Sequence, residues 1–174
     1  AAAVVAVISN WSKAYGLTRA QNLGIPTEIL PFEKDSDRRA YDSYLAARVS
    51  AYAPDYVILA GWMRLLTSNF LSCFPGRVIN LHPALPGTFP GTHAIERAYA
   101  AYQRGEIEHS GVMVHLVPDE GVDDGPVLAV QSITFRPGEP LTEFEQRVHA
   151  LEHQLLVKTL RAVLGGSEPG TWQD

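Results

Sequence analysis

The stretch Tyr56-Val57-Ile58-Leu59-Ala60 decides the fold, because it is short and apolar at every position. A strand that is apolar on both faces is typical of a parallel sheet covered by helices on each side. A second strand is predicted for Val78-Ile79-Asn80-Leu81-His82, which Pro83 stops. The residues between the two runs include a short helix predicted over 67–74. Strands joined in this way indicate parallel pairing through crossover connections.

Toward the N-terminus the same alternation of strand and helix continues. The predicted elements, in chain order, are a buried strand over 4–8, a helix over 13–23, a strand over 27–30 and a helix over 37–52. Gly24 follows the first helix as a stop signal, and Asp37 stands near the N-cap of the second.

Toward the C-terminus the alternation changes. Two β-rich runs, 110–117 and 127–135, follow a predicted helix over 93–104 with no helix between them, so we expect antiparallel pairing near the C-terminal strands. A last helix is predicted over 141–164. The whole pattern predicts one α/β domain over residues 1–174, with an open, mostly parallel, Rossmann-like sheet and helices on both faces. Ligands of such sheets bind beyond the carboxyl ends of the strands.

Composition excludes several classes of protein. The chain has 174 residues, of which 46% are hydrophobic and 19% charged, with a net charge of −5 and no basic run. A nucleic-acid partner is therefore not expected. Cys73 is the single cysteine, so no intramolecular disulfide or cysteine zinc cluster can form. No apolar stretch approaches the roughly 20 residues of a membrane span, and we expect a cytoplasmic protein.

The chemistry centres on Asn80 and His82. Side chains alternate along a strand, so these two project to the same face, at the end where Pro83 turns the chain away. An amide donor beside a protonated imidazole suits a reaction in which negative charge develops on a carbonyl oxygen. Each residue taken alone is more often structural, because Asn before a Pro turn is commonly a turn former.

A carboxylate near His82 would raise its pKa and keep the ring charged. The acidic turn over 119–126 is the source, although spacing alone leaves open which carboxylate reaches the ring. His149 and His153 share one face of the last helix, but the residue order of a metalloprotease and a third ligand are missing, so no metal is expected. The chain contains neither G-x-G-x-x-G nor G-x-S-x-G, which disfavours dehydrogenases and serine hydrolases.

Four motifs together resemble the 10-formyltetrahydrofolate-dependent formyltransferases. They are Ala60-Gly61-Trp62-Met63-Arg64-Leu65-Leu66, Asn80-Leu81-His82-Pro83-Ala84-Leu85-Pro86, Pro90-Gly91 and Val122-Asp123-Asp124-Gly125-Pro126. The resemblance runs from about Val4 to Val163. Within the family, the Met-Arg-x-Leu segment and the Glu152-His153 pair are most similar to members that formylate glycinamide ribonucleotide.

The resemblance implies formyl transfer from 10-formyltetrahydrofolate, as co-substrate, to the amine of glycinamide ribonucleotide in purine synthesis, by a monomer or homodimer without a metal. It assigns catalysis to Asn80, His82 and Asp123, and places Asp124 at the family's variable position. The residues implied to bind folate are Arg38, Met63, Arg64, Leu65, Leu66, Asp119, Glu120, Gly121 and Val122. Those implied to bind the nucleotide are Gly61, Pro83, Gly91, His149 and Glu152.

The start of the sequence departs from the family pattern. Members begin with a strand and a Gly-Ser-rich phosphate loop, and nothing before Val4 resembles them, so we expect a sheet without that central strand. Two alternatives therefore stand beside the transferase. One is a formyltetrahydrofolate deformylase, which uses the same catalytic residues with water as the nucleophile. The other is a non-catalytic folate-binding remnant.

Overall fold

A computed structural model describes residues 2–33 and 35–166. The chain divides into two compact units, and each is described by itself. The N-terminal unit comprises Ala1–Tyr56 with Leu66–Phe74, and the C-terminal unit comprises Val57–Leu65 with Pro75–Asp174. That the chain forms one domain over residues 1–174 stays a prediction.

The N-terminal unit is a small α/β assembly around two parallel strands. Its elements are β1 (Val7–Ser9), α1 (Tyr15–Asn22), β2 (Thr27–Ile29), α2 (Arg38–Ser50) and α3 (Ser68–Leu71). β1 pairs with β2 in parallel, and α1 contacts both strands. The predicted cap of α2 is confirmed, because the Asp37 side chain accepts hydrogen bonds from the Arg39 and Ala40 backbone N–H groups.

Polar contacts tie the helices of this unit together. Glu28 on β2 accepts two hydrogen bonds from the guanidinium of Arg48, at 2.9 and 2.6 Å, and a third from the Tyr52 hydroxyl at 2.6 Å. Asp42 on α2 is 2% exposed and accepts a hydrogen bond of 2.6 Å from the backbone N–H of Thr67, which precedes α3. These contacts satisfy groups that would otherwise be buried without a partner.

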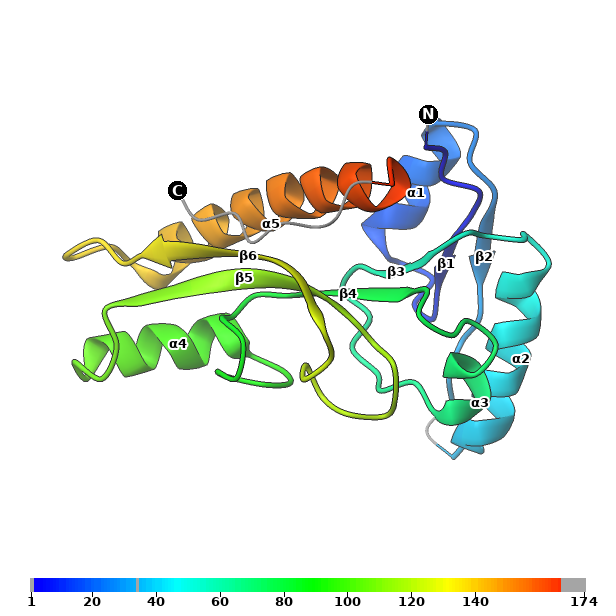
Figure 1. Cartoon of the computed structure of the whole chain (residues 1–174), viewed down its shortest axis with the longest axis horizontal. Helices are drawn as coiled ribbons and strands as arrows, with labels where there is room; N and C mark the ends of the chain where they lie inside the picture. Colours follow the sequence, from blue (N-terminus) through cyan, green and yellow to red (C-terminus); the bar gives the residue numbers. More distant parts are fainter. Residues whose placement is uncertain (1, 34, 167–174) are drawn as a thin grey trace. The chain divides into compact units, whose positions relative to one another are not determined.

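The C-terminal unit contains a four-stranded mixed sheet (Figure 1). The strands are β3 (Val57–Leu59), β4 (Val78–His82), β5 (His109–Leu116) and β6 (Val127–Thr134), and the helices are α4 (Ala94–Gln103) and α5 (Leu141–Leu164). The spatial order is β3-β4-β5-β6, with β3 and β4 parallel and the other pairs antiparallel. The predicted antiparallel pairing of the C-terminal strands is therefore confirmed.

The core of this unit lies between the sheet and α5, which runs alongside β5 and β6 (Figure 1). Buried residues of the core include Val112, Val114, Phe144 and Leu155. An aromatic cluster joins α4 to α5. The Phe135 ring stacks on Tyr102 of α4 and on Phe144 of α5, with ring centroids 4.3 Å apart in both pairs. The ring centroids of Tyr99 and Phe144 lie 6.1 Å apart. Across the described residues, no helix combines the length and the apolar character that a membrane span requires.

The predicted α/β class, with parallel pairing and antiparallel C-terminal strands, is confirmed, and the described strands form two sheets because none of them pairs with both β1 and β3. Two predicted bounds were wrong. The first strand begins at Val7 rather than Val4, because the short β2 offers partners only from Val7 to Ser9, and Val4 and Val5 are 60% and 44% exposed. The helix predicted over 67–74 is shorter, with α3 limited to Ser68–Leu71, whereas the bounds of β4 and α5 coincide with their predictions.

Candidate active site

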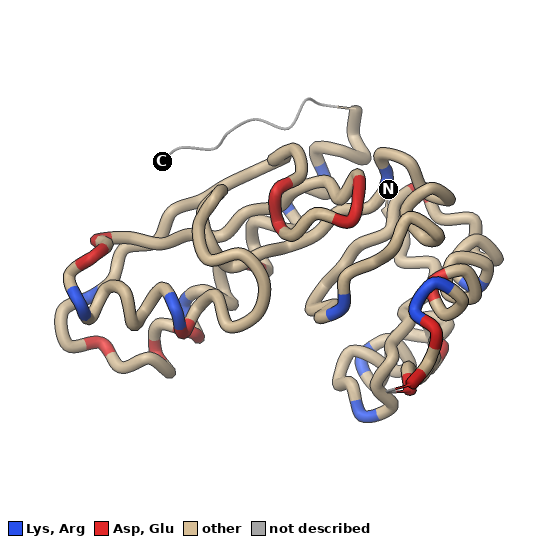
Figure 2. Tube along the Cα trace, turned by 90° about the horizontal axis from the view of Figure 1, so that it is seen from below, with Lys and Arg blue, Asp and Glu red and all other residues tan. Residues whose placement is uncertain are grey.

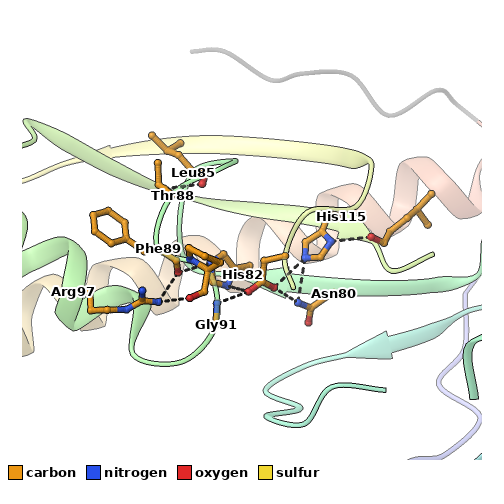
Figure 3. Close-up of polar contacts among 11 residues, drawn as sticks. Asn80, His82, Leu85, Thr88, Phe89, Gly91, Arg97 and His115 are labelled. Carbon is orange, nitrogen blue, oxygen red and sulfur yellow. Dashed lines mark hydrogen bonds and ion pairs between the residues drawn. The ribbon is translucent and has the colours of Figure 1, made fainter. Parts of the chain in front are cut away.

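β4 presents Asn80 and His82 on the same face of the sheet, as alternation along a strand predicts. Both side chains reach one carboxylate, that of Asp123. Figure 3 labels Asn80 and His82 among the polar contacts of this cluster. Asn80 Nδ2 donates to Asp123 Oδ1 at 3.1 Å, and His82 Nδ1 lies 3.3 Å from Asp123 Oδ2. The spacing of the sequence left the choice of carboxylate open, and in the structure Asp123 is the one within reach of the ring.

Asp123 is held in a left-handed backbone conformation, with φ of 54°. Aspartate tolerates this region better than most residues with a side chain. Its Oδ2 also accepts a hydrogen bond of 2.8 Å from the backbone N–H of Gly91. Burial alone would raise the pKa of Asp123, but hydrogen bonds from His115 and Gly91 and the nearby His82 outweigh it, so the pKa lies below its ordinary value. The carboxylate is therefore ionised at neutral pH.

His82 is 4% exposed, and burial dominates its titration. Burial lowers the pKa of His82 below its ordinary value, while Asp123 and the carbonyl of Phe89 act in the opposite direction. The prediction that Asp123 raises this pKa is right for that one interaction but wrong for the net shift. Nε2 of the ring lies 3.2 Å from the Phe89 carbonyl oxygen, so both ring nitrogens face an acceptor. Such surroundings support a proton on either nitrogen.

His115 completes the cluster, although the sequence pattern did not predict its role. It lies opposite Asn80 in the β4–β5 register and is 2% exposed. Its Nε2 lies 3.2 Å from Asn80 Nδ2 and 3.4 Å from Asp123 Oδ1. A histidine within the apolar run 112–116 was a detectable signal. Its partners could be assigned only from the register between two strands.

The turn that carries Asp123 depends on its glycines. A Cβ at Gly125 would overlap the carbonyl oxygen of Leu116, and one at Gly121 would overlap the carboxylate of Asp124. Gly121 N–H also donates to Asp119 Oδ1 at 2.9 Å. The turn contains two acidic pairs, and acidic residues are red in Figure 2. The glycines therefore allow a tight turn that brings one carboxylate of four onto the histidines.

A cavity of about 330 Å³ opens beside Asp123. It is mainly apolar, with a carboxylate at its edge, which is the usual character of a small-molecule site. Its lining residues are Pro86, Gly87, Thr88, Pro90, Met113, Val122, Asp123, Asp124, Gly125 and Val127.

The residues expected to bind folate fall in both units. Met63 and Leu65, in the C-terminal unit, are 70% and 44% exposed, so neither is an ordinary core residue. Leu66 belongs to the N-terminal unit and is 4% exposed, and Arg38 begins α2 of that unit. Of the expected residues near Asp123, Val122 is 39% exposed. The other residues expected to bind folate also lie outside the core; they are Arg64, Asp119, Glu120 and Gly121.

The residues expected to bind the nucleotide all belong to the C-terminal unit. Gly91 contacts Asp123 directly, and Pro83 follows His82 at the end of β4. Gly61 has φ of 73°, which favours glycine. On α5, His149 Nδ1 lies 2.6 Å from Glu152 Oε2, so these two side chains form a pair.

A larger hollow of about 610 Å³ lies elsewhere in the C-terminal unit, beside Tyr99, Tyr102 and the segment 137–140. It contains no member of the Asp123 cluster, and its carboxylate, Glu139, is occupied by Arg147. We therefore assign the chemistry to the smaller cavity. Residues 2–33 and 35–166 contain no group of three or more His, Cys, Asp or Glu placed to hold a metal ion.

Comparisons with known proteins agree with this geometry. A family model described as formyl transferase matches residues 1–160. Phosphoribosylglycinamide formyltransferase of Schizosaccharomyces pombe is 41% identical over 173 residues, covering 94% of this chain and 83% of that protein. The protein of the same name from Escherichia coli is 40% identical over 152 residues, covering 87% of this chain and 69% of the relative.

Solved structures give the same result. Glycinamide ribonucleotide transformylase 1 from Symbiobacterium toebii matches with a TM-score of 0.86 and 35% identity, covering 94% of this chain and 74% of that one. Phosphoribosylglycinamide formyltransferase from Bacillus halodurans matches with a TM-score of 0.87 and 32% identity, covering 98% of this chain and 86% of that one. The chain belongs to the formyl transferase family.

Proposed function

We propose that this protein transfers the formyl group of 10-formyltetrahydrofolate to the amine of glycinamide ribonucleotide, a step of de novo purine synthesis in the cytoplasm. Relatives named for this activity, with identities of about 40%, support the assignment. The observation that carries it is the meeting of Asn80 and His82 over the carboxylate of Asp123.

In the proposed mechanism the substrate amine attacks the formyl carbon, and a carbon–nitrogen bond forms while the carbonyl oxygen becomes negative. The side-chain N–H of Asn80 and the protonated Nδ1 of His82 stabilise this oxyanion. The bond from the formyl carbon to N10 of the folate then breaks. Asp123, directly or through a water, accepts the proton that the amine loses, and N10 gains one, so protons balance overall.

The lowered pKa of His82 suits this mechanism. Burial favours the neutral ring in the empty site, but an oxyanion beside Nδ1 favours the charged ring, which takes its extra proton from solvent and returns it after the product leaves. The ring therefore stabilises the transition state more than the ground state, which is the condition for catalysis. A ring that stayed charged throughout would also stabilise the carbonyl of the bound substrate, and the transition state would gain less relative to the ground state.

We propose that the exposed segment 63–65 and the turn 119–122 bind the pterin, with Arg64 on the carboxylates of the folate tail. Glu152 would accept hydrogen bonds from the ribose hydroxyls, beside His149, while Gly61, Pro83 and Gly91 line the nucleotide path. Replacing Glu152 by Gln should raise KM for the nucleotide roughly tenfold, as expected for one lost charged hydrogen bond, with little change in kcat. Glu145→Gln on the same helix is the matched control.

The decisive assay follows 10-formyltetrahydrofolate turnover with and without glycinamide ribonucleotide. Formyl transfer requires the amine, so turnover should depend on the ribonucleotide and produce formylated nucleotide. Formate release at the same rate without the amine would instead identify a deformylase. Folate binding by calorimetry without any turnover would identify a non-catalytic folate-binding protein.

A further inference from the structure

The loop between β4 and α4 has an unusual backbone. Four alternate residues, Gly87, Phe89, Gly91 and His93, have positive φ values of 74°, 46°, 79° and 57°. The two glycines adopt this region freely, but Phe89 and His93 carry side chains that disfavour it. A bulky residue in this region is strained and persists only where its surroundings hold it.

Arg97 on α4 supplies that restraint at Phe89. Its Nη2 donates to the carbonyl oxygens of Phe89 and Pro90, at 2.7 and 2.5 Å. Its guanidinium also lies 5.9 Å from the centroid of the Phe89 ring. Figure 3 shows the two dashed contacts from Arg97 to the loop, on the side of the loop away from Asn80. Hydrogen bonds from a charged donor are about twice as strong as neutral ones.

The carbonyl that Arg97 holds is also the partner of His82. Phe89 O lies 3.2 Å from His82 Nε2, and two residues later the backbone N–H of Gly91 donates to Asp123. One short segment thus orients both the imidazole and the carboxylate. In the charged ring, the Phe89 carbonyl accepts the proton on Nε2, so the proton on Nδ1 points toward Asp123, where the proposed reaction takes place.

We propose that Arg97 is a positioning residue for formyl transfer: by holding the Phe89 and Pro90 carbonyls, it fixes the tautomer and the direction of the His82 ring. The role rests on the proposed function, because it serves the same imidazole. Arg97 contacts neither substrate nor the reacting atoms in this scheme. Without it, the left-handed Phe89 can relax and the carbonyl can leave Nε2.

The pKa of His82 is a poor reporter of this role. The charge of Arg97 lowers that pKa, whereas the Phe89 carbonyl raises it, so loss of Arg97 removes two opposing influences. The tautomer of the neutral ring reports the balance between the Phe89 carbonyl at Nε2 and Asp123 at Nδ1, and Arg97 contacts only the first of these two acceptors. We therefore choose 15N chemical shifts of the histidine rings, recorded at about pH 8, well above the ordinary pKa of His.

The first experiment compares the wild-type chain with Arg97→Met and Arg97→Lys. His82→Gln identifies the His82 signals among those of six histidines. We expect a larger fraction of rings with the proton on Nε2 in the wild type than in Arg97→Met, where Asp123 at Nδ1 is left as the dominant acceptor. Lysine keeps a charged donor that can contact a carbonyl, so Arg97→Lys should lie between them. Unchanged His82 signals in Arg97→Met would overturn the proposal.

The second experiment measures steady-state kinetics. Arg97→Met should lower kcat roughly 10- to 100-fold, the range for a displaced catalytic group, with KM values within about twofold. Arg97→Lys should recover part of kcat. The control is Arg104→Met, because Arg104 ends the same helix and pairs only with exposed Glu106 among the contacts described. Equal losses in Arg97→Met and Arg104→Met, or a change confined to KM, would contradict the positioning role.

The two experiments separate the failure of this inference from the failure of the proposed function. If the wild-type chain does not formylate the ribonucleotide, the function fails, and the tautomer measurement still decides whether Arg97 orients His82. If the wild type is active and Arg97→Met retains full kcat, the function stands and the inference fails.

Discussion

Two buried carboxylates of the C-terminal unit, Asp123 and Glu139, show how similar burial serves different purposes. The side chain of Glu139 is 3% exposed and accepts hydrogen bonds of 2.8 and 2.7 Å from Nη1 of Arg147. The side chain of Asp123 is 11% exposed and faces two histidines at 3.3 and 3.4 Å. Arginine stays charged at every accessible pH, whereas histidine changes its charge near neutrality.

The difference separates a structural ion pair from a reactive cluster. Glu139 also contacts its surroundings through its backbone, because Tyr99 OH donates to its carbonyl at 2.6 Å, which ties α4 to the β6–α5 connection. Asp123 is instead surrounded by groups that can gain or lose a proton, in a residue with left-handed backbone. A permanently charged partner holds Glu139 in one ionisation state, whereas the titratable partners of Asp123 can gain or lose a proton.

The largest effect is expected for His82→Ala. Loss of the imidazole removes an oxyanion donor and the partner of Asp123, so kcat should fall by roughly 10³-fold or more. Formyl transfer at saturating substrates measures it, with His109→Ala at the exposed start of β5 as the control. A rate near that of the wild type would refute the role assigned to His82.

Exchanging each carboxylate for its amide tests the comparison directly. Asp123→Asn should lower kcat by roughly 10²- to 10³-fold while stability changes little, because the amide keeps the volume but cannot accept a proton. Glu139→Gln should leave kcat intact and lower the free energy of unfolding by about 3 kcal/mol, because Arg147 loses its partner. Kinetics and urea unfolding are measured for both variants.

A neighbouring acidic residue serves as the control for the exchange. Glu143→Gln, in the first turn of α5, should retain activity and change stability little. The distinction between the two carboxylates fails if Glu139→Gln loses activity at full stability, or if Asp123→Asn is unfolded.

A smaller effect is expected for His115→Gln. Glutamine can contact Asn80 or Asp123 but not both with the geometry of the ring, so kcat should fall roughly tenfold, the equivalent of one charged hydrogen bond. His109→Gln on the same strand is the control. An unchanged kcat would show that His115 only fills the core.

The smallest effect concerns stability against pH. The folded pKa of His82 lies below its ordinary value of 6.5, so the unfolded chain binds more protons just below that pH, and stability rises as pH increases toward 7. The lowered pKa of Asp123 acts in the same direction, but only below about pH 4. Urea midpoints between pH 5 and 7.5 should therefore increase, and His82→Gln should flatten the curve. An equally steep curve in the variant would assign the effect to other groups.

Much of the candidate site could be predicted from local sequence. The alternation along 78–82 put Asn80 and His82 on one face, and Pro83 marked the end of the strand. His115 and Phe89 were not predicted, because one contributes through cross-strand register and the other through a backbone carbonyl. A main-chain group has no signature in the residue types.

The sequence by itself determined the elements, since apolar periodicity and the breakers Gly24 and Pro83 act over a few residues of chain. Local pattern left open which of four carboxylates meets His82; the family resemblance implied Asp123, and only the tertiary structure brought it to the ring and divided the strands into two sheets. The physical reason is that these outcomes depend on strand register and turn geometry between residues far apart in the chain. Asn80 and Asp123, joined at 3.1 Å, are 43 positions apart.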